Sequence, residues 1–65
     1  MQILVNGEPL TTDASTLAEL CTTLGLAQAK VATAVNGSFI ASAQRELTQL
    51  SPKDEIEIVA PRQGG

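Results

Sequence analysis

The sequence predicts an α+β domain in which one main helix packs on one face of a mixed sheet of four to five strands. Three observations lead to this class. Short segments alternate apolar and polar residues, as half-buried strands do. Two pairs of these segments are joined by Asn-Gly, and a stretch between the pairs has apolar residues at helical spacing. The expected order is β-β-α-β-β-β, in a chain of 65 residues with room for a single domain.

The first two strands are expected at the start of the chain. Residues 2–6 have the alternation of a strand, and Asn6-Gly7 favours a type I′ turn, because both central residues of that turn need a positive φ. Residues 8–11 return as the second strand. Pro9 has no amide hydrogen to donate to a neighbouring strand, so this second strand is expected at an edge of the sheet.

A short helix is expected next. Thr16 and Glu19 match a capping box, in which Thr16 accepts a hydrogen bond from the amide of Glu19 and the glutamate reaches back; Ser15 is a competing cap. The apolar residues that follow at the spacing of one helix face are Leu17, Leu20, Cys21 and Leu24. Gly25 stands where a left-handed helix cap favours glycine. Such a short helix is not stable alone, so it must pack on the sheet.

The second half of the chain repeats the hairpin signal. Residues 31–35 predict a third strand, Asn36-Gly37 a second type I′ turn, and residues 38–40 the returning strand. Residues 55–59 predict the last strand, with alternate residues facing the core.

The segment at residues 41–50 has no clear periodicity. It is expected to be a loop or a short helical turn that places Leu47 and Leu50 in the core. Pro52 then occupies the second position of a turn. The expected core consists of Ile3, Val5, Leu17, Leu20, Leu24, Val35, Leu47, Leu50, Ile56 and Ile58, completed by Phe39 or Ile40.

The composition argues against several classes of function. The chain has no His, Trp or Tyr, one Cys, one Phe and a net charge of −3. Without His it lacks the most frequent general base, and a zinc site would depend on carboxylates and one Cys. An acidic chain with almost no aromatic residues lacks the cations and stacking rings of a nucleic-acid-binding protein. We therefore expect no catalytic residue, no metal site and no nucleic-acid partner.

The chain also has no recognisable export or membrane signal. Its first apolar run is three residues long, and no stretch approaches the about 20 apolar residues of a membrane span. A lone cysteine fits a reducing compartment, so a cytoplasmic location is expected, with no membrane partner. Cys21 lies on the apolar helix face and is expected to be a buried structural residue.

The segment at residues 60–65 is expected to be a flexible tail that follows a domain at residues 1–59. Pro61 ends the last strand, and no apolar residue after it ties the segment to the core. Gly64 and Gly65 lack a Cβ, which lets the backbone enter a narrow channel and approach reacting atoms closely. The Gly65 carboxylate is then a group that another enzyme can activate with ATP.

Five segments of the chain carry a resemblance to a known family through their order and spacing. They are Met-Gln-Ile-Leu-Val-Asn-Gly at 1–7, Thr-Leu-Ala-Glu-Leu at 16–20, Val-Ala-Thr-Ala-Val-Asn-Gly at 31–37, Asp-Glu-Ile-Glu-Ile-Val at 54–59 and Gly64-Gly65. The whole chain thereby resembles the ThiS family of ubiquitin-like β-grasp sulfur carriers. Lys53 departs from the pattern, because the family often has Gly before the Asp.

The resemblance implies a carrier protein that is not an enzyme and binds no cofactor of its own. An E1-like, ThiF-like adenylyltransferase would use ATP and Mg to convert the Gly65 carboxylate into an acyl-adenylate, with Gly64 giving access. A sulfurtransferase or cysteine desulfurase would supply sulfur, leaving a thiocarboxylate on Gly65. A ThiG-like thiazole synthase would then use this sulfur in thiamine biosynthesis.

A partner surface is expected on the sheet face that the helix leaves open. The residues expected to form a flat apolar patch there are Leu4, Ala32, Ala34 and Val59. This patch is expected to dock the E1-like enzyme. Arg62 in the tail is expected to pair with acidic groups of that enzyme or to stand in water.

Two other functions stay open. A sulfur carrier of another pathway, such as a molybdopterin-type carrier, or a ubiquitin-like modifier would have the same fold and tail. A plain interaction module would have the fold with an incidental Gly-Gly.

Overall fold

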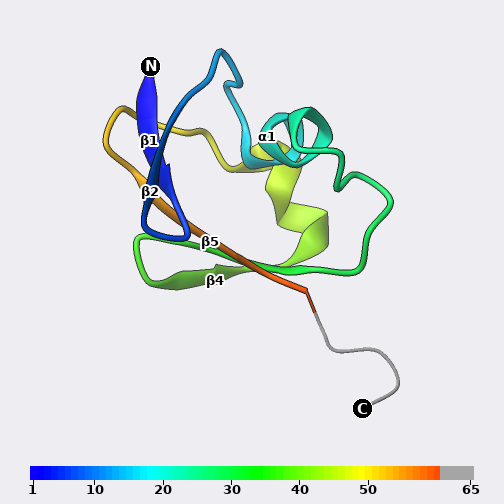
Figure 1. The fold of residues 1–65 in the computed structure, drawn as a ribbon. Helices are drawn as coiled ribbons and strands as arrows, with labels where there is room; N and C mark the ends of the chain where they lie inside the picture. Colours follow the sequence, from blue (N-terminus) through cyan, green and yellow to red (C-terminus); the bar gives the residue numbers. More distant parts are fainter. Residues whose placement is uncertain (61–65) are drawn as a thin grey trace.

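A computed structural model of the chain, which describes residues 1–60, contains five short strands in one mixed sheet (Figure 1). The elements in chain order are β1 (Gln2–Val5), β2 (Glu8–Thr11), α1 (Leu17–Thr23), β3 (Ala32–Val35), β4 (Ser38–Ile40), the 3₁₀ helix η1 (Ser42–Leu47) and β5 (Glu55–Val59). The expected order is confirmed, and η1 is the short helical turn left open for residues 41–50. No helix within residues 1–60 is long and apolar enough to cross a membrane.

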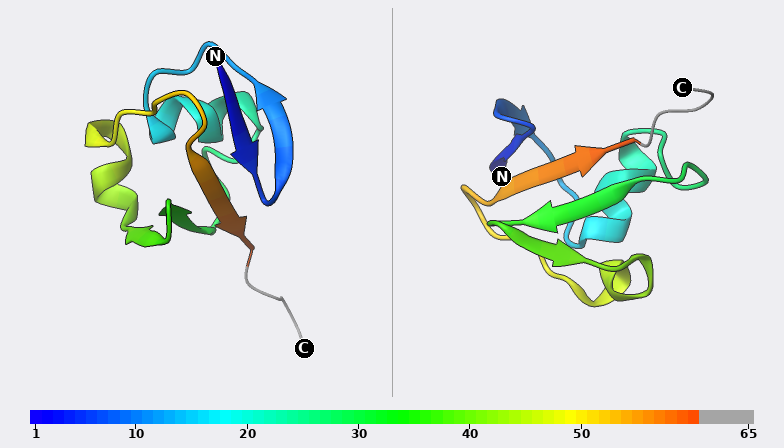
Figure 2. Two further views of the ribbon diagram at one scale, coloured as in Figure 1. Left: turned by 90° about the vertical axis from the view of Figure 1, so that its left-hand side faces the viewer. Right: turned by 90° about the horizontal axis from the view of Figure 1, so that it is seen from below.

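Strand β5 lies between two hairpins and joins them into one sheet. The order across the sheet is β2-β1-β5-β3-β4. Each hairpin is antiparallel, whereas β5 is parallel to β1 and antiparallel to β3. The right-hand view of Figure 2 shows β5, β3 and β4 side by side. β2 is an edge strand, as Pro9 predicted.

Both hairpins turn through Asn-Gly in the left-handed backbone region. The φ angles are 52° at Asn6 and 84° at Gly7, and 50° at Asn36 and 86° at Gly37. Positive φ at both central residues is what a type I′ turn requires, so both turn predictions are confirmed.

The N-terminal end of α1 is held by the expected cap with one change. Thr16 Oγ1 accepts a hydrogen bond from the Glu19 amide at 3.2 Å. The Glu19 carboxylate reaches back to Ser15, one residue earlier than the capping box predicts, and accepts from its hydroxyl and its amide, both at 2.7 Å. The Ser15 hydroxyl, followed by its amide, lowers the pKa of Glu19, because these bonds stabilise the charged carboxylate.

The C-terminal end of α1 forms a Schellman motif. Gly25 has a φ of 77°. The Gly25 amide donates to the Thr22 carbonyl at 3.0 Å, and the Leu26 amide donates to the Cys21 carbonyl at 2.8 Å. Leu24 forms the cap and is 37% exposed, so its expected place in the core is wrong. The helix ends before the Leu24 side chain can continue the buried stripe.

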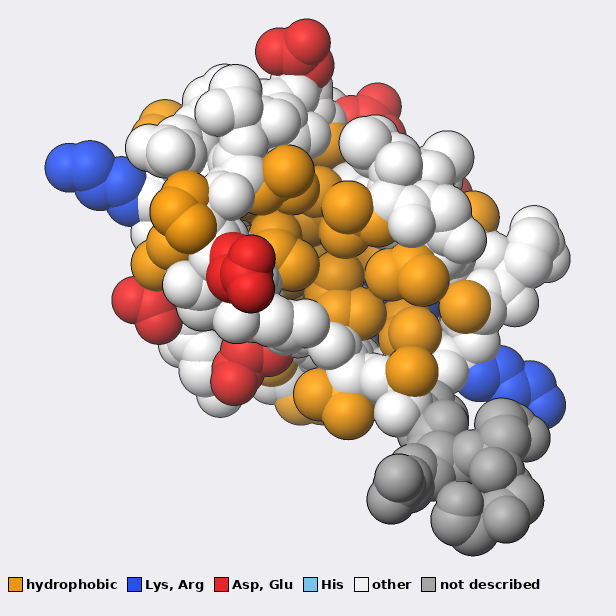
Figure 3. All heavy atoms as spheres, in the orientation of Figure 1, with side chains coloured by type: hydrophobic (Ala, Val, Ile, Leu, Met, Phe, Trp, Pro, Cys, Tyr) orange, Lys and Arg blue, Asp and Glu red, His pale blue; other side chains and the backbone are white. Residues whose placement is uncertain are grey.

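The core lies between the sheet and the helices. Figure 3 shows hydrophobic side chains gathered across the middle of the molecule in the orientation of Figure 1. The buried apolar residues are Ile3, Ala14, Leu17, Leu20, Cys21, Leu50 and Ile56. Half-buried residues packed against this cluster are Met1, Val5, Leu10, Val35, Ile40 and Ile58. Cys21 is buried as expected, whereas Ala14 was not predicted.

The segment after η1 explains why only one of the two expected leucines enters the core. The Leu50 amide donates to the Ser15 carbonyl and the Leu17 amide donates to the Thr48 carbonyl, both at 2.9 Å. These bonds fix residues 48–50 beside the start of α1, where Leu50 is buried. Leu47 ends η1 before this contact and is 75% exposed, so its predicted burial is wrong.

Ile40, and not Phe39, completes the core. Ile40 lies opposite the buried Thr33 in the β3–β4 pairing, so its side chain shares the covered face. Phe39 lies opposite Ala34 on the other face and is 71% exposed.

Candidate functional site

The sheet face away from α1 contains the four residues of the expected patch. Ala32 lies opposite Val59, and Ala34 lies opposite Phe39; residues paired in this way point to the same side of a sheet. Leu4 shares this face, because it alternates with core-facing neighbours on β1. Phe39 was missed, although a two-residue turn after Val35 fixes it opposite Ala34.

Two carboxylates divide this open face. Glu55 of β5 lies opposite Leu4, and Glu57 lies opposite Ala34. Leu4 is therefore separated from the other three residues of the expected patch, so that the four do not form the continuous apolar surface that was expected. The remaining residues, here called the open-face group, are Ala32, Ala34, Phe39 and Val59.

A groove of about 540 Å³ adjoins the end of β5. Residues 29–32, Ser42, Arg45 and Val59 line it. Arg45 is fixed there, because its Nε donates to Thr33 Oγ1 at 3.1 Å and its Nη2 donates to the Val31 carbonyl at 2.7 Å. The groove contains Arg45 and a lysine but no acidic side chain, so it is a positively charged part of an acidic domain.

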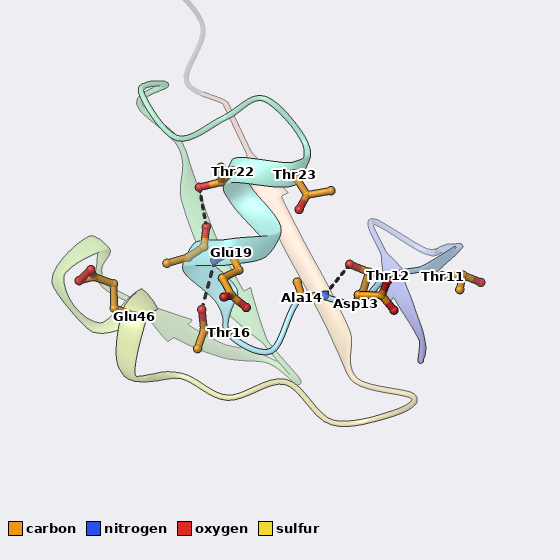
Figure 4. Close-up of a pocket in the computed structure, with 10 residues that line it drawn as sticks. Thr11, Thr12, Asp13, Ala14, Thr16, Glu19, Thr22, Thr23 and Glu46 are labelled. Atoms are coloured by element: carbon orange, nitrogen blue, oxygen red, sulfur yellow. Dashed lines mark hydrogen bonds between the residues drawn. The ribbon is translucent and has the colours of Figure 1, made fainter.

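A larger hollow of about 930 Å³ lies beside α1 and is lined mainly by Thr, Asp and Glu side chains (Figure 4). Its hydroxyls make local bonds: Thr12 Oγ1 accepts from the Ala14 amide at 3.1 Å, and Thr22 Oγ1 donates to the Ala18 carbonyl at 3.2 Å. Among residues 1–60, no group of three or more His, Cys, Asp or Glu is placed to hold a metal ion. The bonded hydroxyls of this hollow therefore stabilise the helix and the turn before it.

The residues expected to carry the chemistry lie outside the described part of the chain. These are Gly64 and Gly65, together with Arg62 and the rest of residues 61–65. The structure places the residues that lead to them. Val59, the last residue of β5, is 62% exposed, and Ala60 after it is also exposed.

A mixed sheet of five strands in this order, with one helix across a face, defines a β-grasp domain. The crystal structure of thiamine biosynthesis protein ThiS from Geobacter metallireducens is similar, with a TM-score of 0.82, 32% sequence identity and full coverage of both chains. The NMR solution structure of a thiamine biosynthesis protein from Geobacter metallireducens has a TM-score of 0.80 and 29% identity, covering 100% of this chain and 88% of that chain. No curated protein sequence matches the chain significantly.

The ThiS family model matches residues 3–65. The chain therefore belongs to the ThiS family, and the expected β-grasp fold is confirmed.

Proposed function

We propose that the chain is a sulfur carrier of thiamine biosynthesis, and that its C-terminal glycine holds the sulfur. The observation that carries this proposal is the extent of the ThiS-family match, which continues through the tail to Gly65. The similar Geobacter metallireducens protein, solved by crystallography and by NMR and described as a thiamine biosynthesis protein, supports the same pathway. The domain is then a substrate of other enzymes and has no catalytic side chain of its own.

The proposed chemistry begins with the Gly65 carboxylate, whose oxygen is a poor leaving group. An E1-like adenylyltransferase of the ThiF type binds ATP and Mg²⁺. A carboxylate oxygen attacks the α-phosphorus, and pyrophosphate leaves, so the product is an acyl-adenylate with AMP as a good leaving group. Gly64 lets the backbone pass into the active site without a side chain in the way.

Sulfur then arrives as a persulfide on a sulfurtransferase or cysteine desulfurase. Its terminal sulfur attacks the carbonyl carbon of the acyl-adenylate, and AMP leaves with the electrons of the C–O bond. A second thiol reduces the S–S bond of the acyl disulfide, which releases the Gly65 thiocarboxylate and forms a new disulfide. A thiazole synthase of the ThiG type takes up this sulfur, and the partner enzymes supply the proximity that accelerates each step.

The open face of the sheet is the proposed contact with the E1-like enzyme. Three members of the open-face group, Ala32, Phe39 and Val59, are exposed apolar residues, and Val59 is followed directly by the segment that ends in Gly65. A partner bound there would hold the start of the tail. Leu4 would extend this contact beyond Glu55, and Arg62 would pair with acidic groups of the enzyme. We propose the cytoplasm as the location of these reactions.

The test is an intact-mass measurement after incubation with ATP, Mg²⁺, a ThiF-like enzyme and a persulfide donor. We expect a mass gain equal to the replacement of one oxygen by sulfur, and no gain in a chain without Gly64 and Gly65. Sulfur loading only by a molybdopterin-type activating enzyme would place the carrier in that pathway. A covalent adduct with another protein would indicate a modifier, and no change with any activating enzyme would indicate an interaction module.

A further inference from the structure

The side chain of Asn6 continues the pairing between β1 and β5 after the backbone of β1 has turned away. The last backbone bond of this pairing runs from the Asn6 amide to the Ile56 carbonyl, at 2.8 Å. Beyond it, Asn6 Oδ1 accepts from the Ile58 amide at 2.9 Å, and Asn6 Nδ2 donates to the Ile58 carbonyl at 3.0 Å. Both backbone groups of Ile58 are therefore bound by one side chain that is 52 residues away in the sequence.

This arrangement works because a carboxamide has the same donor and acceptor as a peptide group. Asn6 also tolerates the positive φ that the type I′ turn demands, so a single residue closes the hairpin and holds β5. On its other edge, Ile58 lies opposite Thr33 of β3. The strand is thus held from both sides one residue before it ends at Val59.

We propose that Asn6 is a positioning residue for the C-terminal segment: it fixes the end of β5, from which the chain continues to Gly65. The proposal rests on the proposed function, in which Gly65, seven residues after Ile58, must enter the active site of an activating enzyme. Without the Asn6 bonds, both backbone groups of Ile58 lose their partners, and the end of β5 is held only by its pairing with β3, so it becomes more mobile. The enzyme must then order more backbone before it can react with Gly65.

The second hairpin provides a matched control. Asn36 occupies the same place in its own type I′ turn, and its side chain also binds the chain at β5. Its Oδ1 accepts from the Glu55 amide at 2.9 Å, and its Nδ2 donates to Asp54 Oδ1 at 3.0 Å. These contacts lie at the first residue of β5 and the residue before it, at the opposite end of the strand from Val59. Glycine at either position keeps a turn-compatible backbone and removes only the carboxamide.

The experiment compares wild type, Asn6→Gly and Asn36→Gly in steady-state adenylation by a ThiF-like enzyme with ATP and Mg²⁺. Ordering one residue corresponds to an about 5- to 30-fold change in an equilibrium constant, so we expect Asn6→Gly to lower kcat by about 5-fold or more. Docking affinity without ATP, measured by calorimetry, should stay unchanged in Asn36→Gly and fall less than kcat in Asn6→Gly, because Val59 is the one member of the open-face group at the loosened end of β5. Asn36→Gly should keep the wild-type kcat, and Asn6→Asp, which retains the acceptor for the Ile58 amide, should recover part of the loss.

A second measurement does not depend on the enzyme. Amide hydrogen exchange should become faster at Ile58, Val59 and Ala60 in Asn6→Gly, and stay at wild-type rates there in Asn36→Gly. Equal kcat in the two glycine variants, or unchanged exchange at Ile58 in Asn6→Gly, would overturn the positioning role. If wild type is not adenylated at all, the proposed function fails, and the exchange rates alone decide whether Asn6 fixes the end of β5.

Discussion

Alternate residues of each strand point to opposite faces of the sheet, and the side chains of the two faces differ in polarity and burial. On the covered face, β5 contributes Ile56, which is buried, and Ile58, which is half-buried against the core. On the open face, the same strand contributes two carboxylates and the exposed Val59. The covered face is continuous and mostly apolar, with the buried Thr33 as a polar member, whereas the open face is divided and partly charged. We therefore expect stability and the proposed partner docking to depend on different side chains, so that mutations can change one without the other.

The largest expected effect is the loss of a side chain from the covered face. Leu20 of α1 is fully buried, and Leu20→Ala should cost about 2–5 kcal/mol through lost burial and a residual cavity. A core in a domain of this size supplies only about 3–5 kcal/mol, so we expect the variant to be largely unfolded in far-UV circular dichroism. Val59→Ala on the open face should change the free energy of unfolding by less than about 0.5 kcal/mol. Similar losses in both variants would contradict the division between the faces.

Truncation of Phe39, in the open-face group, is expected to weaken docking without reducing stability. Phe39→Ala should leave the free energy of unfolding within about 0.5 kcal/mol of wild type, because the ring is 71% exposed. It should weaken docking to the ThiF-like enzyme by about ten-fold, as expected for an aromatic side chain that is buried on binding. Calorimetric titration measures this affinity.

Leu47→Ala is the matched control for Phe39→Ala. Leu47 is equally exposed and apolar, at 75%, but lies on η1 and not on the sheet. Its truncation should leave the docking affinity unchanged. An equal loss of affinity in both variants would show that exposed apolar area, and not the open face, determines docking.

Sequence patterns a few residues long were sufficient to predict the turns and the helix caps. The two Asn-Gly turns, the Thr16 cap and Gly25 each act within a few residues, and each was predicted at its observed place. The errors arose where distant contacts decide burial. Leu47 is exposed because the chain at residues 48–50 is fixed against α1, a contact that no local pattern encodes.

The open face was predicted only in part for a similar reason. Alternation within each strand assigned Leu4, Ala32, Ala34 and Val59 to one face. The separation of Leu4 from the others requires the strand order, which places β5 and its carboxylates between β1 and β3. The Asn6 contact with Ile58 depends on the same arrangement across 52 residues, so it could not be predicted from the turn alone.

A smaller effect is expected where the chain enters β5. Lys53 has a φ of 72°, a conformation that costs a residue with a side chain about 1–2 kcal/mol. Lys53→Gly removes this cost but raises the entropy of the unfolded chain, a penalty of about 0.5–1 kcal/mol, so a net gain of about 0.5–1 kcal/mol is expected in urea unfolding. Docking should not change, because neither face is altered. Lys53→Ala retains the Cβ and should give no gain; an equal gain would show that the charge, and not the backbone, is responsible.

The smallest expected effect concerns Glu19, which stabilises the helix that covers the sheet. Hydrogen bonds from Ser15 hold the pKa of Glu19 below its ordinary value of 4.5 in the folded protein. A lowered folded-state pKa means that the charged group stabilises the fold above the unfolded-state pKa, and that this contribution is lost as the pH falls through the folded-state value. In Glu19→Gln, the free energy of unfolding should therefore fall less steeply with acidification below about pH 5, as measured by urea unfolding at a series of pH values. Ser15→Ala removes the hydroxyl donor but keeps the carboxylate charge, and should also make the slope less steep; a wild-type slope in this variant would assign the effect to net charge, not to the cap that secures the covered face.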